Sequence, residues 1–179
     1  MSKNLLLILD LDETLIHASS TKLDTEPDFF YEQYFVYKRP FLDTFFKEIS
    51  AHFLIGIWSS ADDIYVQEII QKITPENINF EIVWGKNRCS LKRDVDLDQY
   101  IFEKRLKKLE TKGFKLEQVL IVDDTPEKVK VNYGNAIYIN PFRGEKEDKE
   151  LLDLYRYLLQ LKSSLNVRTI EKRYWKQSI

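Results

Sequence analysis

Asp10, Asp12 and Glu13 follow a nearly pure aliphatic segment in the string LLLILDLDETLIH, which begins at residue 5. Carboxylates this close repel one another, and desolvating them costs free energy unless a cation compensates. A second acidic group, Asp123 and Asp124, follows another aliphatic run. If the fold brings both groups to one point, they form a hard, oxygen-rich site of the kind that Mg²⁺ prefers.

Short aliphatic runs alternate with stretches of helical spacing along the chain. Five runs predict buried strands over residues 5–9, 53–58, 80–84, 119–122 and 136–139. Helical spacing predicts helices over residues 41–49, 62–73, 100–110, 127–132 and 147–161. This alternation predicts an α/β fold, a doubly wound and mostly parallel five-stranded sheet with helices on both faces.

Polar residues come directly after three of the predicted strands. The first acidic group follows the first strand, Ser59 and Ser60 follow the second, and the second acidic group follows the fourth. Ligands of such folds gather at the carboxyl ends of the strands. We therefore expect all three groups to face one crevice.

These residues carry a resemblance to the haloacid-dehalogenase (HAD) superfamily. The string DLDET at residues 10–14 is similar to the DxDx[TV] motif of HAD phosphatases. Further matches are RPFLDTFF, WSSA, NRC, EKRLKKLE, VLIVDDTPEK and NYGNAIYI. Together they resemble the FCP/SCP-like, or NLI-interacting-factor-like, branch, several members of which act on the carboxy-terminal repeats of RNA polymerase II. The resemblance covers residues 5 to about 161 and implies a HAD-like (Rossmannoid) sheet.

The resemblance implies a two-step hydrolysis. Asp10 is expected to attack phosphorus and form an aspartyl-phosphate. Asp12 is expected to protonate the leaving oxygen and then to deprotonate the attacking water. The Asp10 carboxylate, the Asp12 carbonyl and the Asp124 carboxylate are the expected Mg²⁺ ligands. Asp123 is expected to contact the ion through water or to orient the other ligands. Which of Asp123 and Asp124 ligates the ion directly stays open.

The phosphate also needs donors and a lysine. Ser59 matches the second HAD motif, with Thr14 and Ser60 as further phosphate-binding candidates, although both serines could serve only as helix caps. We expect Lys104 in EKRLKKLE to be the family's lysine, at the start of a predicted helix, in preference to Lys92, Lys107 and Lys108.

The segment from about 18 to 38 is too short for a large cap domain, and its aromatic, β-prone end predicts a hairpin beside an open crevice. Candidate walls and anion contacts for a bulky substrate are Phe30, Tyr31, Tyr34, Arg39 and Arg88. The alternative is that the aromatic residues cover the core and that Arg39 pairs with an acidic neighbour.

The sequence thus predicts a Mg²⁺-dependent phosphomonoester hydrolase acting on phosphoserine or phosphothreonine in a protein. The alternatives are a phosphatase for small phosphate esters with the same mechanism and a non-catalytic phosphoprotein-binding module. A receiver-like domain is disfavoured because Trp84-Gly85-Lys86 follows the third predicted strand without an aspartate. A P-loop kinase is disfavoured because no G-x-x-x-x-G-K-[ST] string occurs.

Bulk properties set further limits. The length of 179 residues predicts one domain. Its basic C-terminal segment, at about 162–179, could dock a phosphate-rich partner; the favoured alternative is a solvated segment whose two aromatic residues pack back on the body. The net charge of −2 gives no signal for nucleic acid or membrane binding, and a single cysteine, Cys89, excludes an internal disulfide. No segment approaches the length of a signal-peptide core or a membrane span. We therefore expect a cytoplasmic protein, or a nuclear one in a eukaryote.

Overall fold

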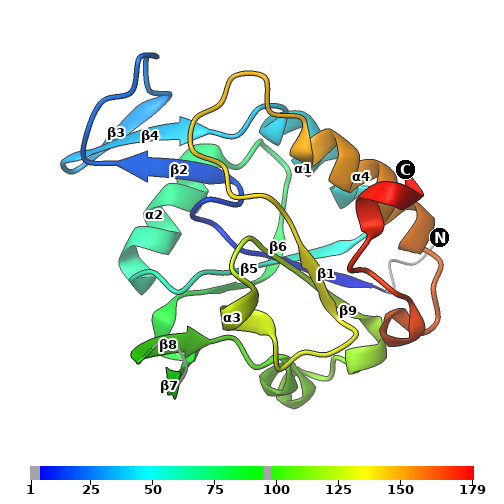
Figure 1. The fold of residues 1–179 in the computed structure, drawn as a ribbon. Helices are drawn as coiled ribbons and strands as arrows, with labels where there is room; N and C mark the ends of the chain where they lie inside the picture. Colours follow the sequence, from blue (N-terminus) through cyan, green and yellow to red (C-terminus); the bar gives the residue numbers. More distant parts are fainter. Residues whose placement is uncertain (1–4, 95–97) are drawn as a thin grey trace.

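The computed structural model describes residues 5–94 and 98–179 (Figure 1). Its centre is a five-stranded sheet in the order β10-β9-β1-β5-β6, in which each neighbouring pair is parallel. The strands are β1 (Leu6–Leu9), β5 (Leu54–Trp58), β6 (Phe80–Trp84), β9 (Val119–Asp123) and β10 (Ala136–Tyr138). Along the chain, β5 and β6 are added on one side of β1, and β9 and β10 are then added on its other side. The carboxyl end of β1 is therefore a topological switch point. The predicted doubly wound α/β fold is confirmed.

One face of the sheet packs against three amphipathic helices. These are α1 (Leu42–Ser50), α2 (Asp63–Ile73) and α4 (Glu150–Leu161), and α1 and α4 lie side by side (Figure 1). The apolar residues of each helix recur every three or four positions and join a buried cluster with Leu7 and Leu9 of β1. Fully burying one such leucine side chain contributes about 1.5–3 kcal/mol to folding. These helices hold the central strands, and hence the strand ends, in place.

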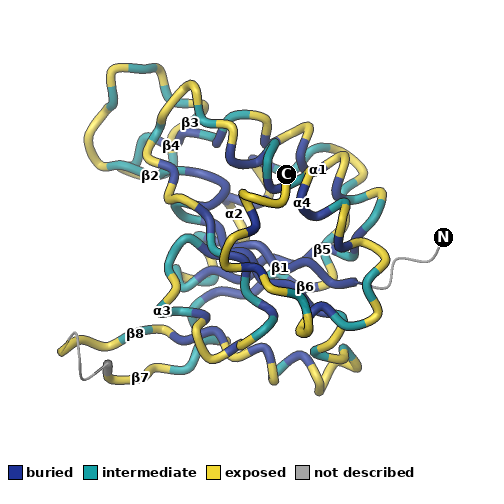
Figure 2. Tube along the Cα trace, turned by 45° about the vertical axis from the view of Figure 1, so that its right-hand side comes forward, coloured by how far each residue is buried: buried dark blue, intermediate teal, exposed yellow. Residues whose placement is uncertain are grey.

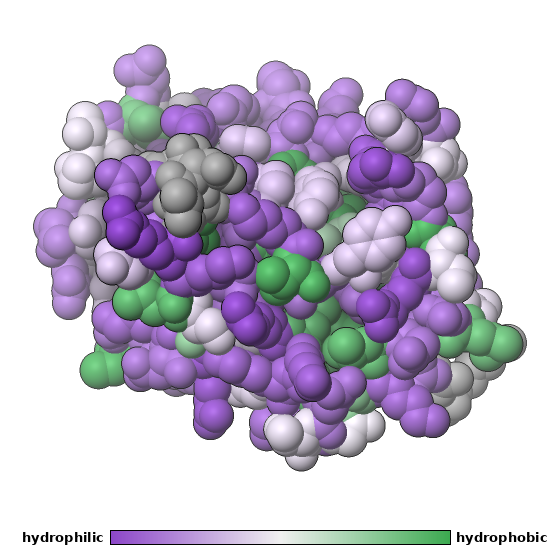
Figure 3. Space-filling model, turned by 60° about the horizontal axis from the view of Figure 1, so that its bottom comes forward, coloured by the Kyte–Doolittle hydropathy of each residue, from purple (hydrophilic) through white to green (hydrophobic). Residues whose placement is uncertain are grey.

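A thinner layer covers the opposite face, where Leu6 and Ile8 of β1 point. It consists of α3 (Pro126–Val129) and two 3₁₀ segments, Leu106–Lys112 and Leu116–Gln118. Figure 3 looks at the lower side of Figure 1, where the surface is mostly hydrophilic, with a group of hydrophobic side chains near the centre of the view and others scattered around it. The residues of the second apolar cluster are nevertheless buried under these short segments.

The predicted helix over residues 100–110 is wrong. Strand β8 (Gln99–Glu103) pairs with β7 (Ser90–Asp94) as an antiparallel hairpin, and a 3₁₀ segment begins at Leu106. Residues 100–102 are Tyr, Ile and Phe, which favour a strand, and the pairing satisfies their backbone groups. The predicted helix over residues 127–132 is real but shorter.

Two antiparallel additions flank the carboxyl ends of the parallel strands. The first contains β2 (Ile16–Ser19), β4 (Tyr34–Lys38) and β3 (Phe29–Tyr31) in that order, and it confirms the predicted small insertion. The second is the β7–β8 hairpin, which was not predicted. Both project on the same side of the molecule, and most described residues of the loop before β3 and of strands β7 and β8 are exposed (Figures 1 and 2).

Arg39 ties the first loop to the start of α4. Its side chain is fully buried, and its guanidinium donates to the carbonyls of Thr14 (3.1 Å) and Asn140 (2.9 Å) and to both oxygens of Asp148 (2.9 and 2.8 Å). The suggestion that Arg39 contacts a substrate anion is therefore wrong, and the alternative of an acidic partner is confirmed. The pair fixes the loop that carries the first acidic motif.

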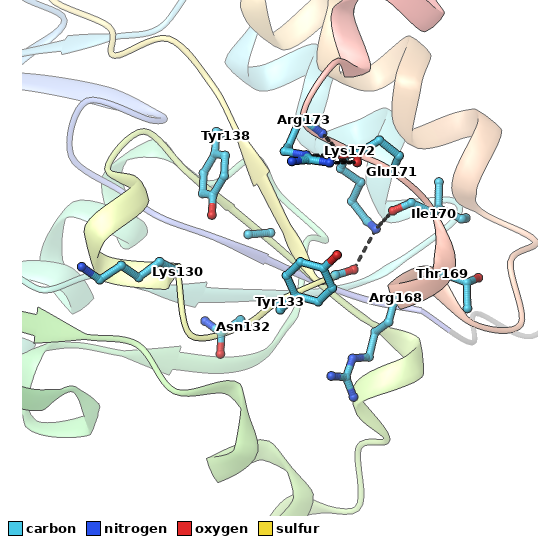
Figure 4. A pocket seen from close by; sticks show the side chains of 12 residues that line it. Lys130, Asn132, Tyr133, Tyr138, Arg168, Thr169, Ile170, Glu171, Lys172 and Arg173 are labelled. Atoms are coloured by element: carbon cyan, nitrogen blue, oxygen red, sulfur yellow. Dashed lines mark hydrogen bonds and ion pairs between the residues drawn. The ribbon is translucent and has the colours of Figure 1, made fainter.

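The C-terminal segment packs against the edge strand β10. Trp175 is buried and donates from Nε1 to the carbonyl of Tyr138 at 2.7 Å, whereas Tyr174 is exposed. Lys172 is also buried, and its ammonium donates to three backbone carbonyls: Gly134 and Ile170 at 2.7 Å each, and Val167. Figure 4 shows Lys172 reaching toward the turn before β10. Of the two tail aromatic residues, only Trp175 packs on the body as predicted.

Candidate active site

A buried lysine joins the ends of two neighbouring strands. Asp10 follows β1 and Asp123 ends β9, and Lys104 Nζ lies 2.6 Å from a carboxylate oxygen of each. Burial alone would lower the pKa of Lys104, but attraction to Asp10 and Asp123 outweighs it and holds the pKa above its ordinary value. Lys104 therefore stays charged. It meets Asp10 as the resemblance implied, although it follows a strand rather than starting a helix.

Three carboxylates converge beside this lysine. One oxygen from each of Asp10, Asp123 and Asp124 lies within 4.8 Å of the other two. Asp10 Oδ2 and Asp124 Oδ1 are buried and accept no hydrogen bond from any residue in the described ranges. Burial and the Asp10 charge raise the pKa of Asp123 to about 6 and also raise that of Asp124. Uncompensated carboxylate oxygens of this kind fit a hard divalent cation.

The two aspartates after β9 have different surroundings. Asp123 Oδ2 accepts from Lys104, and its Oδ1 accepts from the backbone N–H of Thr125 at 2.9 Å. Asp124 has one oxygen 3.3 Å from the Thr125 hydroxyl and the other without a donor in the described part of the chain. Because the oxygens of Asp123 are already occupied, Asp124 has the more available ligand atom.

Asp12 meets two hydroxyl groups, one from Tyr65 in α2 and one from Ser59 just after β5. Tyr65 donates to Asp12 Oδ1 at 2.5 Å, and Ser59 donates to Oδ2 at 3.3 Å. Burial raises the pKa of Asp12 to about 6, and the hydrogen bond from Tyr65 opposes that rise. Ser59 Oγ also accepts from the N–H of Ala61 at 3.0 Å, so its capping and site contacts coexist. Asp12 is thus placed to carry a proton near neutral pH.

Asn132 holds the backbone around Lys104. Its amide donates to the Lys104 carbonyl at 2.6 Å and accepts from the N–H of Leu106 at 3.0 Å, while the Lys104 N–H donates to the Lys128 carbonyl. Sequence reasoning missed both Asn132 and Tyr65. Asn132 lies in the NYGNAIYI string, whose resemblance to the family could have identified it as a candidate. No motif or residue spacing in the sequence identifies Tyr65 as a site residue.

The remaining candidate residues, Thr14, Ser60 and Arg88, differ in burial and in their contacts. Thr14 is fully buried, and its hydroxyl has no hydrogen-bond partner among the described residues. Ser60 is partly buried beside Ser59. Arg88 is exposed, and its guanidinium lies 5.6 Å from the centroid of the Trp84 ring. The phosphate-binding roles of Thr14, Ser60 and Arg88 therefore stay predictions.

A cavity of about 590 Å³ opens beside Asp12, between α2 and the β3–β4 turn. Tyr31 and Tyr34 line it as suggested, but Phe30 is exposed and packs against Phe35 instead, with ring centroids 5.3 Å apart. Tyr31 and Tyr34 also pack against the core cluster. We call this space, lined by Asp12, Glu13, Ala18, Tyr31, Glu32, Gln33, Tyr34, Ala61, Asp62, Ile64 and Tyr65, the lateral groove.

Comparison with solved structures supports the fold class. The fission yeast RNA polymerase II CTD phosphatase Fcp1, solved as an R271A variant bound to beryllium fluoride, matches with a TM-score of 0.55 at 16% sequence identity. The match covers 95% of this chain and 59% of that one. This chain therefore shares the α/β fold of that solved structure.

The chain belongs to the NLI interacting factor-like phosphatase family, whose model matches residues 5–168. It is 33% identical over 174 residues to CTD small phosphatase-like protein 2 of Dictyostelium discoideum, covering 93% of this chain and 29% of the relative. It is 27% identical over 186 residues to CTD nuclear envelope phosphatase 1B of Danio rerio, covering 96% and 72%. The resemblance to the FCP/SCP-like branch is confirmed, and the first relative is much longer than the matched part.

The predicted cytoplasmic location is wrong. A relative that matches almost the whole chain is named for the nuclear envelope rather than for the cytoplasm. Within the described ranges, no helix combines the length and the apolar character that crossing a bilayer requires.

Proposed function

We propose that this protein is a Mg²⁺-dependent phosphomonoester hydrolase that acts through an aspartyl-phosphate on Asp10, with phosphoserine or phosphothreonine in a polypeptide as substrate. One observation carries the proposal: the Lys104 ammonium bridges Asp10 and Asp123 at 2.6 Å each, beside two buried carboxylate oxygens that have no donor in the described part of the chain. Membership of a phosphatase family agrees with it.

Asp10, Asp12 and Lys104 have different roles in the two steps of the proposed reaction. In the first step, an Asp10 oxygen forms a bond to phosphorus, the ester P–O bond breaks, and Asp12 gives its proton to the departing oxygen. In the second step, Asp12 takes a proton from water, the water oxygen bonds to phosphorus, and the Asp10–phosphorus bond breaks to release inorganic phosphate. Lys104 orients Asp10 throughout. Ser59, whose hydroxyl lies 3.3 Å from Asp12, and Thr14 are the proposed donors for the phosphoryl oxygens.

The donor set fits Mg²⁺. Asp10 and Asp124 offer the two unpartnered oxygens, and the Asp12 carbonyl is the third expected ligand. When bound, the ion supplies positive charge that neutralises the carboxylates and the phosphoryl oxygens. Asp123 serves as the anionic partner of Lys104, since both of its oxygens already accept hydrogen bonds.

A polypeptide substrate is favoured by the small insertion. Three short strands, β2, β3 and β4, stand beside the crevice, and the lateral groove adjoins Asp12. A space of this size can hold side chains that neighbour a phosphoresidue. The alternative is a small phosphate ester hydrolysed by the same residues. A non-catalytic binding module is less favoured, because Asp10, Asp12, Asp124 and Lys104 are all in place.

The test is phosphate release from an aryl phosphate, then from phosphopeptides, sugar phosphates and nucleotides. We expect turnover that stops with EDTA, returns with added Mg²⁺ and is abolished in Asp10→Asn, since an amide is a poor nucleophile. Asp153→Asn, which changes a helix residue paired with Arg156, serves as the matched control and should retain activity. Turnover that survives EDTA, or that Asp10→Asn retains, contradicts the proposal.

A further inference from the structure

The lateral groove is lined by carboxylates and tyrosines. Four of its residues are acidic, namely Asp12, Glu13, Glu32 and Asp62, and three are tyrosines, namely Tyr31, Tyr34 and Tyr65. No lysine or arginine is among its described lining residues. Carboxylates and tyrosine ring faces both attract cations, so one class of ligand suits the whole wall.

The negative charge of the groove is only partly compensated within the chain. Asp62 pairs with Lys86 at 2.8 Å, and Glu13 lies 3.0 Å from His17. Glu32, at the β3–β4 turn with a φ of 48°, makes no ion pair with any residue that the structure describes. A positive group on a ligand would therefore find Glu32 available.

Tyr31 reports the electrostatic character of this wall. Its pKa is raised first by desolvation and then by the charges of Glu68, Glu32 and Asp62. Three carboxylates from two elements thus act on one hydroxyl at the groove surface. The negative charge near this wall favours binding of a positively charged ligand group and opposes binding of a negatively charged one.

The groove begins at the reacting centre. Asp12, which would touch the leaving oxygen, lines it, and Tyr65 connects the two by donating to Asp12 at 2.5 Å. An extended peptide advances about 3.3–3.6 Å per residue. A side chain that enters the groove therefore belongs to a residue close in sequence to the phosphoresidue.

On the basis of the phosphatase function proposed above, we propose that the lateral groove binds a lysine or arginine side chain of the substrate polypeptide, within about three residues of the phosphoserine or phosphothreonine. Glu32 supplies the uncompensated charge, and the tyrosines receive the aliphatic stem and the cationic head. The groove thereby selects substrates by charge next to the phosphate.

The experiment compares kcat/KM for phosphopeptides that differ only in one neighbouring residue: arginine, leucine or glutamate, placed in turn at each flanking position. An aryl phosphate reports the chemical step separately. At low salt we expect wild type to prefer the arginine peptide over the leucine peptide by roughly three- to tenfold, and the glutamate peptide to be poorest. Glu32→Lys should remove or reverse the order, and Glu32→Gln should reduce it.

Glu117→Gln is the matched control, because Glu117 is exposed and lies just before β9, at the opposite end of the strand from Asp123. It should keep the wild-type order. Equal rates for all peptides in an enzyme that hydrolyses the aryl phosphate would overturn this inference and leave the phosphatase proposal intact. A strong preference for phosphocholine over every peptide would instead assign the groove to a small cationic ester. Absence of any hydrolysis by wild type would overturn both proposals.

Discussion

Asp12 and Tyr65 show how a single hydrogen bond tunes the proposed proton carrier. Burial raises the pKa of Asp12 to about 6, and the 2.5 Å bond from Tyr65 limits that rise by stabilising the carboxylate. The first step needs protonated Asp12, and the second needs its carboxylate. A pKa near neutrality lets one side chain serve both steps.

Tyr65→Phe should therefore move the pH profile. Losing the hydrogen bond to the carboxylate raises the pKa of Asp12 further, so the decline of kcat/KM on the alkaline side should shift upward by about one pH unit. The measurement is kcat/KM against pH for a phosphoester with a poor leaving group, whose release needs the proton. Tyr155→Phe, which removes a hydroxyl bonded to Glu48 on the surface, is the control and should leave the profile unchanged. A Tyr65→Phe profile that falls uniformly without moving contradicts this role.

At the scale of the secondary-structure elements, the ion pair between Arg39 and Asp148 fixes the loop after β1 against the start of α4. Arg39 is fully buried, so removing its partner leaves an uncompensated charge. Although burial acts to raise it, the hydrogen bonds and charge of Arg39 hold the pKa of Asp148 below its ordinary range. The pair's contribution to stability is thus complete above the unfolded-state pKa of about 3.9 and is lost as the pH falls through the lower folded-state value.

Asp148→Asn should lower the free energy of unfolding by about 3–5 kcal/mol at pH 7. Urea unfolding at pH 7 measures the change, and a series toward pH 3 should show the difference from wild type shrinking. Asp153→Asn removes an exposed partner of Arg156 and should cost less than about 1 kcal/mol. Equal losses of unfolding free energy in the two variants would contradict the larger contribution expected of the buried pair.

Other elements show what the sequence could and could not predict. Strands β1, β5 and β9 were predictable because continuous aliphatic runs are typical of strands buried on both faces. The sequence predicts a helix where β8 lies because the apolar residues of β8 continue into the 3₁₀ segment at Leu106, and only pairing with β7 decides the conformation. Tyr65 escaped prediction because its partner Asp12 lies 53 residues away in the chain.

For the whole molecule, the fold brings segments that are far apart in sequence to one edge of the sheet. Asp10, Lys104 and Asp123 meet there, although the first two are 94 positions apart in the chain. The aspartates could be predicted as a group because parallel strands end at the same edge. The choice of Lys104 rested on the family resemblance, since spacing does not distinguish it from its neighbouring lysines.

The central claim is that Asp10 carries the phosphoryl group. The most direct measurement incubates Asp12→Asn with Mg²⁺ and an aryl phosphate whose leaving group needs no proton, then locates the phosphoryl group by mass spectrometry of acid-quenched peptides. Because this variant forms the intermediate but lacks the base that activates water, we expect one phosphoryl group on the peptide that contains Asp10, and none in Asp10→Asn. A phosphoryl group on another residue, or wild-type turnover with Asp10 never modified, would contradict the account.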